Sequence, residues 1–341
     1  MKLIIQIPCL NEEASLPVTL RELPTQLDGV DELELLVIDD GSTDRTSQVA
    51  CELGVEHVIR FPRNRGLARA FMAGLDACLR LGADIIVNTD ADNQYCADDI
   101  QKLIQPILDG RAEMVIGDRG VEMVADFSPL KKRLQKLGSW FVRQVSGTDV
   151  PDATSGFRAL SREAALRLNI MSTFSYTIES IIQAGKKGII VTHVPVRTNR
   201  KMRDSRLFTS IKQYIARSLV TTVRMYTMFR PLRVFTLIGT ALLAGGTGVG
   251  LRFIYYLLAG SGTGHIQSVI LCGALIIMGL VTLLIGILAD VISFNRQLIE
   301  DNLYRTRRIE LALEELKRTE GSFTGIDRMH RMEEQAASQR C

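Results

Sequence analysis

The sequence is poor in the residues that build zinc sites, disulfide frameworks and histidine-based active sites. Its 341 residues include six cysteines and four histidines, and neither type forms a closely spaced pair. We therefore expect neither a structural zinc site nor a Ser-His-Asp arrangement. Scattered thiols fit a protein of a reducing compartment.

Aromatic residues are also scarce, at 6% of the chain with one tryptophan, Trp140. The stretch from Arg197 to Arg233 has ten basic residues and one acidic residue, but aromatics do not alternate with these bases as they do in nucleic-acid binders. A nucleic-acid partner is therefore not expected. The N-terminal apolar run stops at Pro8 without a small-residue cleavage site, so we expect a strand there and not a signal peptide.

A pair of acidic residues follows an apolar run at residues 85–87. Asp90 and Asp92 are two positions apart, so on an extended strand their carboxylates face the same side, with Gln94 on the same parity. Oxygen ligands of this kind suit Mg²⁺ or Mn²⁺, which usually share their coordination shell with substrate phosphates. The alternative is a strand-end turn rich in Asp and Asn.

Apolar strands alternate with helical patterns through the first half of the chain. Residues 3–7 and 33–38 each run into a polar cluster, and helices are expected over 45–53 and after Gly66. This alternation predicts a parallel sheet, whose ligands bind at the carboxyl ends of the strands. The polar clusters lie at those ends, which favours a nucleotide site over unrelated turns.

Several of these segments resemble motifs of family 2 glycosyltransferases, in the branch of dolichyl-phosphate mannose synthase and its bacterial polyprenyl-phosphate relatives. The matching segments are Pro8-Cys9-Leu10-Asn11-Glu12, Ile38-Asp39-Asp40-Gly41-Ser42, the Asp90–Asp92 pair, Gly117-Asp118-Arg119 and Asp152-Ala153-Thr154-Ser155-Gly156-Phe157-Arg158. The resemblance implies an α/β catalytic domain of the GT-A, Rossmann-like type over residues 1–206. Leu10 replaces the family's tyrosine, and Arg203 replaces a glycine in the loop that closes over the donor diphosphate.

The resemblance also implies roles for individual residues. The nucleotide-sugar donor is assigned to Pro8, Leu10, Glu12, Ile38, Asp40, Asp90, Ala91, Arg119, Arg200 and Arg206. The cation, Mg²⁺ or Mn²⁺, is assigned to Asp90, Asp92 and Gln94, the catalytic role to Asp92 and Asp152, and the acceptor phosphate to Ser155, Arg158, Lys132 and Arg133. The alternatives are a solvated loop arginine for Arg119 and a structural Asp–Arg turn for Asp152 and Arg158.

The second half of the chain predicts membrane association. Residues 207–231 have apolar positions at helical spacing with bases between them, as in a juxtamembrane amphipathic helix or a helix packed on the catalytic domain. Within residues 232–293, two apolar stretches of about 232–259 and 268–292 are each long enough to span a bilayer. They predict a transmembrane hairpin, and Gly246 and Gly250 are spaced for close helix approach.

The distribution of bases predicts the orientation of this hairpin. The loop between the spans has no Lys or Arg, whereas bases flank both outer ends. We therefore expect a multi-pass protein of the cytoplasmic (inner) membrane with the catalytic domain and both termini cytoplasmic. Residues 294–341 predict a charged helix and a disordered tail from Glu320. Near-heptad apolar residues in that helix suggest a homo-oligomer or a solvated helix.

The predicted function is inverting transfer of one sugar from a UDP- or GDP-linked donor to a polyprenyl phosphate such as undecaprenyl or dolichyl phosphate. An alternative acceptor is a glycan or glycolipid. A processive polysaccharide synthase is disfavoured because the Gln-x-x-Arg-Trp motif is missing around Trp140. A non-catalytic scaffold is disfavoured because Asp90, Asp92 and Arg119 are all present.

Overall fold

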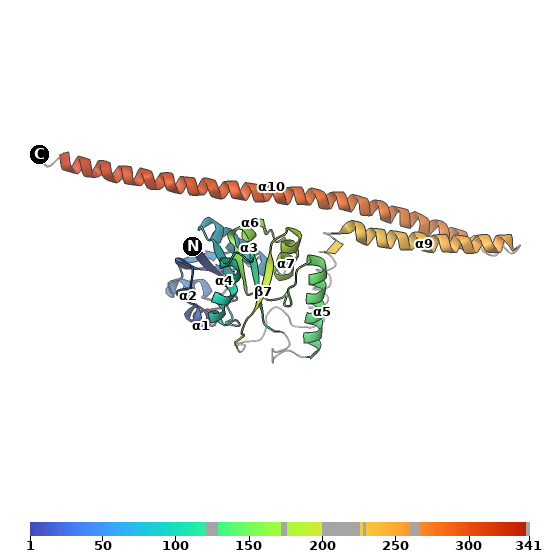
Figure 1. Ribbon diagram of the computed structural model, residues 1–341, viewed down its shortest axis with the longest axis horizontal. Helices are drawn as coiled ribbons and strands as arrows, with labels where there is room; N and C mark the ends of the chain where they lie inside the picture. The colour runs from blue at the N-terminus through green and yellow to red at the C-terminus, as the bar shows by residue number, and fades with distance from the viewer. Residues whose placement is uncertain (121–128, 172–175, 200–225, 228–229, 260–265, 339–341) are drawn as a thin grey trace. The chain divides into compact units, whose positions relative to one another are not determined.

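A computed structural model describes residues 1–120, 129–171, 176–199, 226–227, 230–259 and 266–338. For residues 129–137 and 318–338 it describes the backbone but not the side chains. The chain forms two compact units, one of Met1–Ile215 with Leu303–Cys341 and the other of Ala216–Asn302. Each unit is described by itself below (Figure 1).

The first unit is built on a seven-stranded sheet of order β3-β2-β1-β4-β6-β5-β7. The strands are β1 (Lys2–Cys9), β2 (Glu32–Asp39), β3 (His57–Arg60), β4 (Ile85–Asn88), β5 (Met114–Asp118), β6 (Arg158–Ser161) and β7 (Val191–Pro195). β6 runs antiparallel between β4 and β5, whereas the other pairs are parallel. The parallel sheet expected from the first half of the chain is confirmed for β1 to β4, and β6 adds an antiparallel strand that the sequence did not predict.

Helices cover both faces of the sheet. They are α1 (Leu16–Glu22), α2 (Thr46–Glu52), α3 (Leu67–Arg80), α4 (Ile100–Leu108) after the short 3₁₀ helix η1 (Ala97–Asp99), α5 (Pro129–Ser146), α6 (Arg162–Arg167) and α7 (Thr177–Lys186). Along β1, Leu3, Ile5 and Ile7 share a core with α4, whereas Gln6 meets α3 at Gly74. Because alternate residues of a strand face opposite sides, α3 and α4 lie on opposite faces.

The far end of helix α10 (Ile266–Ser338) belongs to the first unit and lies against α3 and α6. Arg80 pairs with Glu314, and Arg162 pairs with Glu315 at 2.9 Å. The Tyr304 hydroxyl donates to Glu163 at 2.8 Å. These contacts are mostly charged and partly solvated, so each contributes little, on the order of 1 kcal/mol or less.

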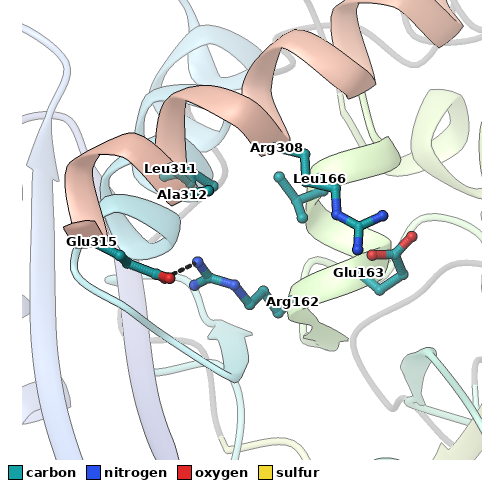
Figure 2. A pocket seen from close by; sticks show the side chains of 7 residues that line it. All are labelled: Arg162, Glu163, Leu166, Arg308, Leu311, Ala312 and Glu315. Atoms are coloured by element: carbon teal, nitrogen blue, oxygen red, sulfur yellow. Dashed lines mark hydrogen bonds and ion pairs between the residues drawn. The ribbon is translucent and has the colours of Figure 1, made fainter.

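A hollow of about 340 Å³ lies between α6 and α10 (Figure 2). Its lining consists of Arg162, Glu163, Leu166, Arg308, Leu311, Ala312 and Glu315. Basic and acidic side chains alternate around it, and Arg162 reaches across to Glu315. None of these residues belongs to the predicted donor or acceptor sites, so the hollow is separate from them.

The second unit contains α9 (Pro231–Leu258) and the first part of α10, and both helices are long and apolar enough to cross a membrane. A Cβ at Gly246 would lie 2.9 Å from Ile276, and one at Gly250 would lie 2.8 Å from the Cys272 sulfur. The expected close approach at these two glycines is confirmed. Bulkier residues there would force the helices apart.

Two expectations about the C-terminal half differ from the structure or lie outside it. Helix α10 is continuous from Ile266 to Ser338, so the helix expected after residue 294 continues the second apolar stretch and extends past Glu320, where a disordered tail was predicted. Residues 320–338 contain no proline, so no proline ring interrupts the helix there. Most of the predicted juxtamembrane segment, 207–231, lies outside the described residues.

Candidate active site

The ends of neighbouring parallel strands bring the polar clusters of the sequence to one edge of the sheet. β1 pairs with β2 so that Cys9 lies beside Asp39, and β1 pairs with β4 so that Gln6 lies beside Asn88. The segments after β1, β2 and β4 therefore leave the sheet together. This edge is where ligands of such sheets bind.

The first two loops are joined by hydrogen bonds around Asn11. Its backbone N–H donates to the Ser42 hydroxyl at 2.9 Å, and its Oδ1 accepts from the Thr43 N–H at 2.8 Å. Asn11 has a φ of 55°, a left-handed conformation that asparagine tolerates better than most residues. Glu12 adds a third link, because its N–H donates to Thr46. These hydrogen bonds fix the two loops that are assigned to the nucleotide before any ligand binds.

The two acids of the Asp39-Asp40 turn have different tasks. Asp39 is fully buried and accepts the Ser42 N–H at 2.7 Å, which closes the turn. Asp40 accepts the backbone N–H groups of Arg65 and Gly66 at 2.7 and 2.9 Å, and burial raises its pKa even though these bonds oppose the shift. Asp40 therefore holds the residues just before α3 at the donor edge, the edge of the sheet where the donor is predicted to bind.

Not every predicted donor residue can use its side chain. Ile38 is fully buried and packs against Gly74 of α3, and Pro8 is buried within β1. The Ile38 side chain belongs to the core, and the assignment of this residue to the donor stays a prediction. Leu10 is partly exposed, Glu12 is nearly buried and bonded to Ser15, and Ala91 is buried.

Asp90 and Asp92 lie in a turn after β4 and not on the strand itself. β4 ends at Asn88, Asn93 has a φ of 54°, and the Asp92 carboxylate accepts the Gln94 N–H at 3.2 Å. The expected strand parity is therefore wrong as the reason for their proximity, which comes from the turn. Burial and the charge of Asp92 raise the pKa of Asp90 to about 7, although Arg119 and Arg158 oppose this shift.

The acidic pair fits a hard divalent cation by its chemistry. Among the described residues, no group of three His, Cys, Asp or Glu side chains is placed to hold a metal ion. Two carboxylates, with the predicted ligand Gln94 two residues further along the chain, would leave coordination positions for substrate phosphate oxygens and water. Gly156 completes the cradle, since a Cβ there would lie 2.8 Å from the Asp90 Oδ2.

Arg119 lies at the end of β5 and is held by Asp152 through two hydrogen bonds. Its Nε donates to Oδ2 at 2.6 Å and its Nη2 donates to Oδ1 at 2.9 Å and to the Thr154 hydroxyl at 2.8 Å. Burial alone would raise the pKa of Asp152, but the Arg119 charge holds it below its ordinary value. The Arg119 side chain is 10% exposed.

The prediction that Asp152 is a catalytic residue is corrected by this geometry. Its side chain is 0% exposed, both carboxylate oxygens accept from Arg119, and its lowered pKa makes it a weak base. Asp152 is therefore placed to orient Arg119 and not to meet a substrate. A structural Asp–Arg pair was the alternative expected for Asp152, with Arg158 as its partner. In the structure the partner of Asp152 is Arg119.

Ser155 and Arg158, which the resemblance assigns to the acceptor phosphate, are held inside the protein. Both are 0% exposed. The Arg158 guanidinium donates to the backbone oxygens of Ser155 and Thr177 and to the Ser180 hydroxyl, and it lies over the Tyr176 ring at 5.0 Å. The hydrogen bonds of this guanidinium are thus made within the protein, and the assignment of both residues to the acceptor phosphate stays a prediction.

The structure adds residues that the sequence did not single out. Asn88 donates to the backbone oxygen of Gly156 and to the Tyr176 hydroxyl, each at 2.9 Å, and the Tyr95 hydroxyl accepts the Gly156 N–H. A polar residue closing the apolar run at 85–88 was the signal for Asn88. The two tyrosines lacked one, because each contributes through a tertiary contact with Gly156 that its own sequence neighbourhood does not indicate.

Four predicted site residues are not placed by the structure. Lys132 and Arg133 belong to α5, but their side chains lie outside the described residues, and Arg200 and Arg206 lie outside them altogether. Their assignments to the acceptor phosphate and the donor diphosphate stay predictions.

The chain is similar to known proteins of one family. The sequence model of glycosyl transferase family 2 matches residues 4–168. The UDP-N-acetylglucosamine–dolichyl-phosphate N-acetylglucosaminyltransferase of Methanococcus voltae is 32% identical, with 56% of this chain and 83% of that protein covered. The undecaprenyl-phosphate mannosyltransferase of Micrococcus luteus is 28% identical, with 61% and 88% covered.

A solved structure shares the fold. The glucosyl-3-phosphoglycerate synthase of Mycobacterium tuberculosis, crystallised with Mn²⁺, UDP and phosphoglyceric acid, superposes with a TM-score of 0.51 and 21% identity. The match covers 65% of this chain and 78% of that one, which establishes a GT-A architecture for the first unit. With its motifs, fold and relatives in agreement, the chain belongs to glycosyl transferase family 2 and is a glycosyltransferase.

Proposed function

We propose that the protein transfers one sugar from a nucleotide-diphosphate donor to the phosphate of a polyprenyl carrier at a membrane surface. The observation that carries the proposal is the convergence of Asp90, Asp92 and the buried Arg119 at one sheet edge, in a chain with two helices able to span a bilayer. The relatives named for dolichyl and undecaprenyl phosphate support this class of acceptor.

The reaction is a displacement at the anomeric carbon. The bond from that carbon to the donor diphosphate breaks, a bond to an acceptor phosphate oxygen forms, and the nucleoside diphosphate leaves with the electron pair. A lipid phosphate is largely anionic at neutral pH, given a second pKa of about 6, so it needs little help from a general base. The burial of Asp152 agrees with this, because the site then works without a base there.

The main electrostatic demand is the negative charge that grows on the departing diphosphate. Asp90, Asp92 and Gln94 would hold Mg²⁺ or Mn²⁺, which supplies positive charge to those oxygens when bound. Arg119 adds a fixed cation from the protein, and Asp152 keeps it from collapsing onto the acidic pair. Asn11, Asp40 and Glu12 shape the part of the site where the nucleotide would lie.

The proposed placement puts the catalytic domain and both termini on the cytoplasmic side. The loop over residues 260–264 lacks Lys and Arg, while bases crowd the segments before α9 and after the first part of α10. Arg252 lies over the Tyr256 ring at 5.7 Å, which suits a pair anchored near the opposite membrane surface. Cysteine labelling from each side of sealed vesicles tests this orientation.

The experiment for the activity uses the full-length protein in detergent with Mn²⁺ or Mg²⁺, undecaprenyl or dolichyl phosphate, and a panel of radiolabelled UDP- and GDP-sugars. We expect metal-dependent label in the organic phase from one donor, lost in Asp92→Ala. Asp149→Ala is the matched control, since Asp149 is 90% exposed and its carboxylate pairs with Arg143. No organic-phase label from any donor, in protein that binds a nucleotide, would overturn the polyprenyl-phosphate acceptor.

A further inference from the structure

The buried arginine beneath the acidic pair has no task in the reaction described so far. Arg158 begins β6, with Asn88 of β4 on one side and Ile116 of β5 on the other. In the part of the chain that the structure describes, Arg158 is the largest residue whose side chain is fully buried. Among the described residues, no carboxylate lies within ion-pair distance of it. Burying a cation without a carboxylate partner costs free energy, so the buried position of Arg158 needs a physical explanation.

The contacts of Arg158 fix the turn that touches Asp90. Its Nη2 donates to the Ser155 backbone oxygen, and its Nη1 donates to Ser180 Oγ at 2.5 Å and to the Thr177 backbone oxygen at 3.4 Å. The guanidinium therefore ties the start of α7 to the peptide just before Gly156. That peptide cannot shift without breaking a charge-assisted hydrogen bond.

Gly156 is the point where this turn meets the acidic pair. A Cβ on Gly156 would lie 2.8 Å from the Asp90 Oδ2 and 3.0 Å from the Tyr176 hydroxyl, so the Asp90 carboxylate packs directly against the glycine backbone. The Gly156 N–H is fixed by Tyr95 at 2.9 Å and its carbonyl oxygen by Asn88 at 2.9 Å. The position of one carboxylate is thus set by a backbone that other groups hold.

The Arg158 guanidinium also packs against a pair of stacked aromatic rings. Arg158 lies 5.0 Å from the centroid of the Tyr176 ring, and Tyr176 stacks on Phe71 of α3 with centroids 4.0 Å apart and planes 7° from parallel. A cation over a buried aromatic face is stabilised by the ring. The Tyr176 ring, itself packed on Phe71, therefore helps to hold the guanidinium in its observed position.

From these contacts we infer that Arg158 is a positioning residue of the cation and diphosphate site, which holds the Ser155–Gly156 turn against Asp90 and so fixes where the cation binds. The inference rests on the proposed function, since it concerns the same site. It also gives each residue of the Ser155-Gly156-Phe157-Arg158 motif a task, with Phe157 stacked on Tyr95 at 5.0 Å to complete the turn.

The test measures Mn²⁺ affinity in the presence of UDP or GDP, by electron paramagnetic resonance of free Mn²⁺, on the full-length protein in detergent. Groups that orient a metal ligand are typically worth about 10- to 100-fold in metal affinity. We expect Arg158→Met to lose about that much and Arg158→Lys, which keeps the charge but not the planar fork, to recover part of it. Thermal unfolding is recorded on each variant.

Arg162→Met is the matched control. Arg162 also donates to two backbone oxygens, of Leu79 and Ala83, but it lies at the start of α6 away from the acidic pair. Its Mn²⁺ affinity should equal that of the unaltered protein. If Arg158→Met does not fold, Arg158→Lys and Gly156→Ala carry the test, since the added Cβ meets Asp90 directly and should also weaken Mn²⁺ binding about 10-fold.

The outcomes separate this inference from the proposed function. Mn²⁺ affinity unchanged in folded Arg158→Lys and Arg158→Met, with only a lower unfolding temperature, would make Arg158 a purely structural residue and overturn the inference. Normal Mn²⁺ and nucleotide binding without a lipid product would overturn the proposed acceptor and leave the inference standing. Absence of Mn²⁺ binding in the unaltered protein with either nucleotide would overturn both.

Discussion

Arg119 and Asp152 form a two-point ion pair in which Nε lies 2.6 Å from Oδ2 and Nη2 lies 2.9 Å from Oδ1. A guanidinium bound along one edge in this way has a fixed plane and direction. Because Thr154 also accepts from Nη2, the arginine reaches the donor edge already oriented.

Replacing Asp152 by asparagine should impair both stability and turnover. Removing one member of a buried ion pair costs roughly 3–5 kcal/mol, and the smaller change to Asn should approach the lower end. Misplacing Arg119 should reduce kcat on the order of 100-fold. Thermal unfolding and the organic-phase assay measure these effects, with the exposed Asp149→Asn as the control. Normal turnover in Asp152→Asn would mean that Arg119 needs no such orientation.

The same pair predicts a pH dependence of stability. The pKa of Asp152 is lowered on folding, so its contribution is present above the unfolded pKa of about 3.9 and is lost as the pH falls through the folded value. The difference in unfolding temperature between the unaltered protein and Asp152→Asn should be constant from about pH 8 to 5 and shrink below about pH 4. A difference independent of pH down to pH 3 would contradict the ion pair.

Asn93 should be replaceable by glycine but not by alanine. Its φ of 54° lies in the left-handed region, where an ordinary side chain costs about 1–2 kcal/mol. Asn93→Ala should therefore distort the turn that carries Asp92 and weaken Mn²⁺ binding, whereas Asn93→Gly should retain most of it. Titration of Mn²⁺ with both variants compares them directly, and equal affinities would show that the turn does not depend on this angle.

Gly41 should be essential for nucleotide binding for a reason beyond its backbone angle. Gly41 and Gly54 both have a φ of 77°, but a Cβ at Gly41 would lie 2.4 Å from the Arg63 backbone, whereas one at Gly54 would meet nothing within 4 Å. Gly54→Ala should cost about 1 kcal/mol of stability and leave UDP and GDP affinity unchanged. Gly41→Ala should weaken that affinity at least 10-fold, as equilibrium binding would measure; equal affinities would contradict the closed turn.

Much of the donor edge was predictable because strand ends are local features of the sequence. Apolar runs broken by Asp, Asn and Gly place Asp40 and Asp90 at the ends of β2 and β4, and the structure brings those ends together. The helical face of α3, including Phe71 and Leu75, was also predictable from its 3.6-residue period.

The errors concern features that depend on distant contacts. The antiparallel strand β6 is only four residues long, and its place between β4 and β5 is a tertiary choice that its own sequence does not encode. For the same reason the sequence could not tell that Arg158 points into the protein and Arg119 toward Asp152. Both are arginines in loop-like motifs, and only packing separates them.

The central claim is that the acceptor is a polyprenyl phosphate, and the most direct measurement is the chemical identity of the product. Full-length protein is incubated with the accepted nucleotide sugar, metal and undecaprenyl phosphate, undecaprenol or undecaprenyl diphosphate, and the lipids are analysed by mass spectrometry and NMR. The account predicts one sugar added to the monophosphate alone, with inverted anomeric configuration. A product from undecaprenol, a chain of several sugars, or a retained configuration would contradict it.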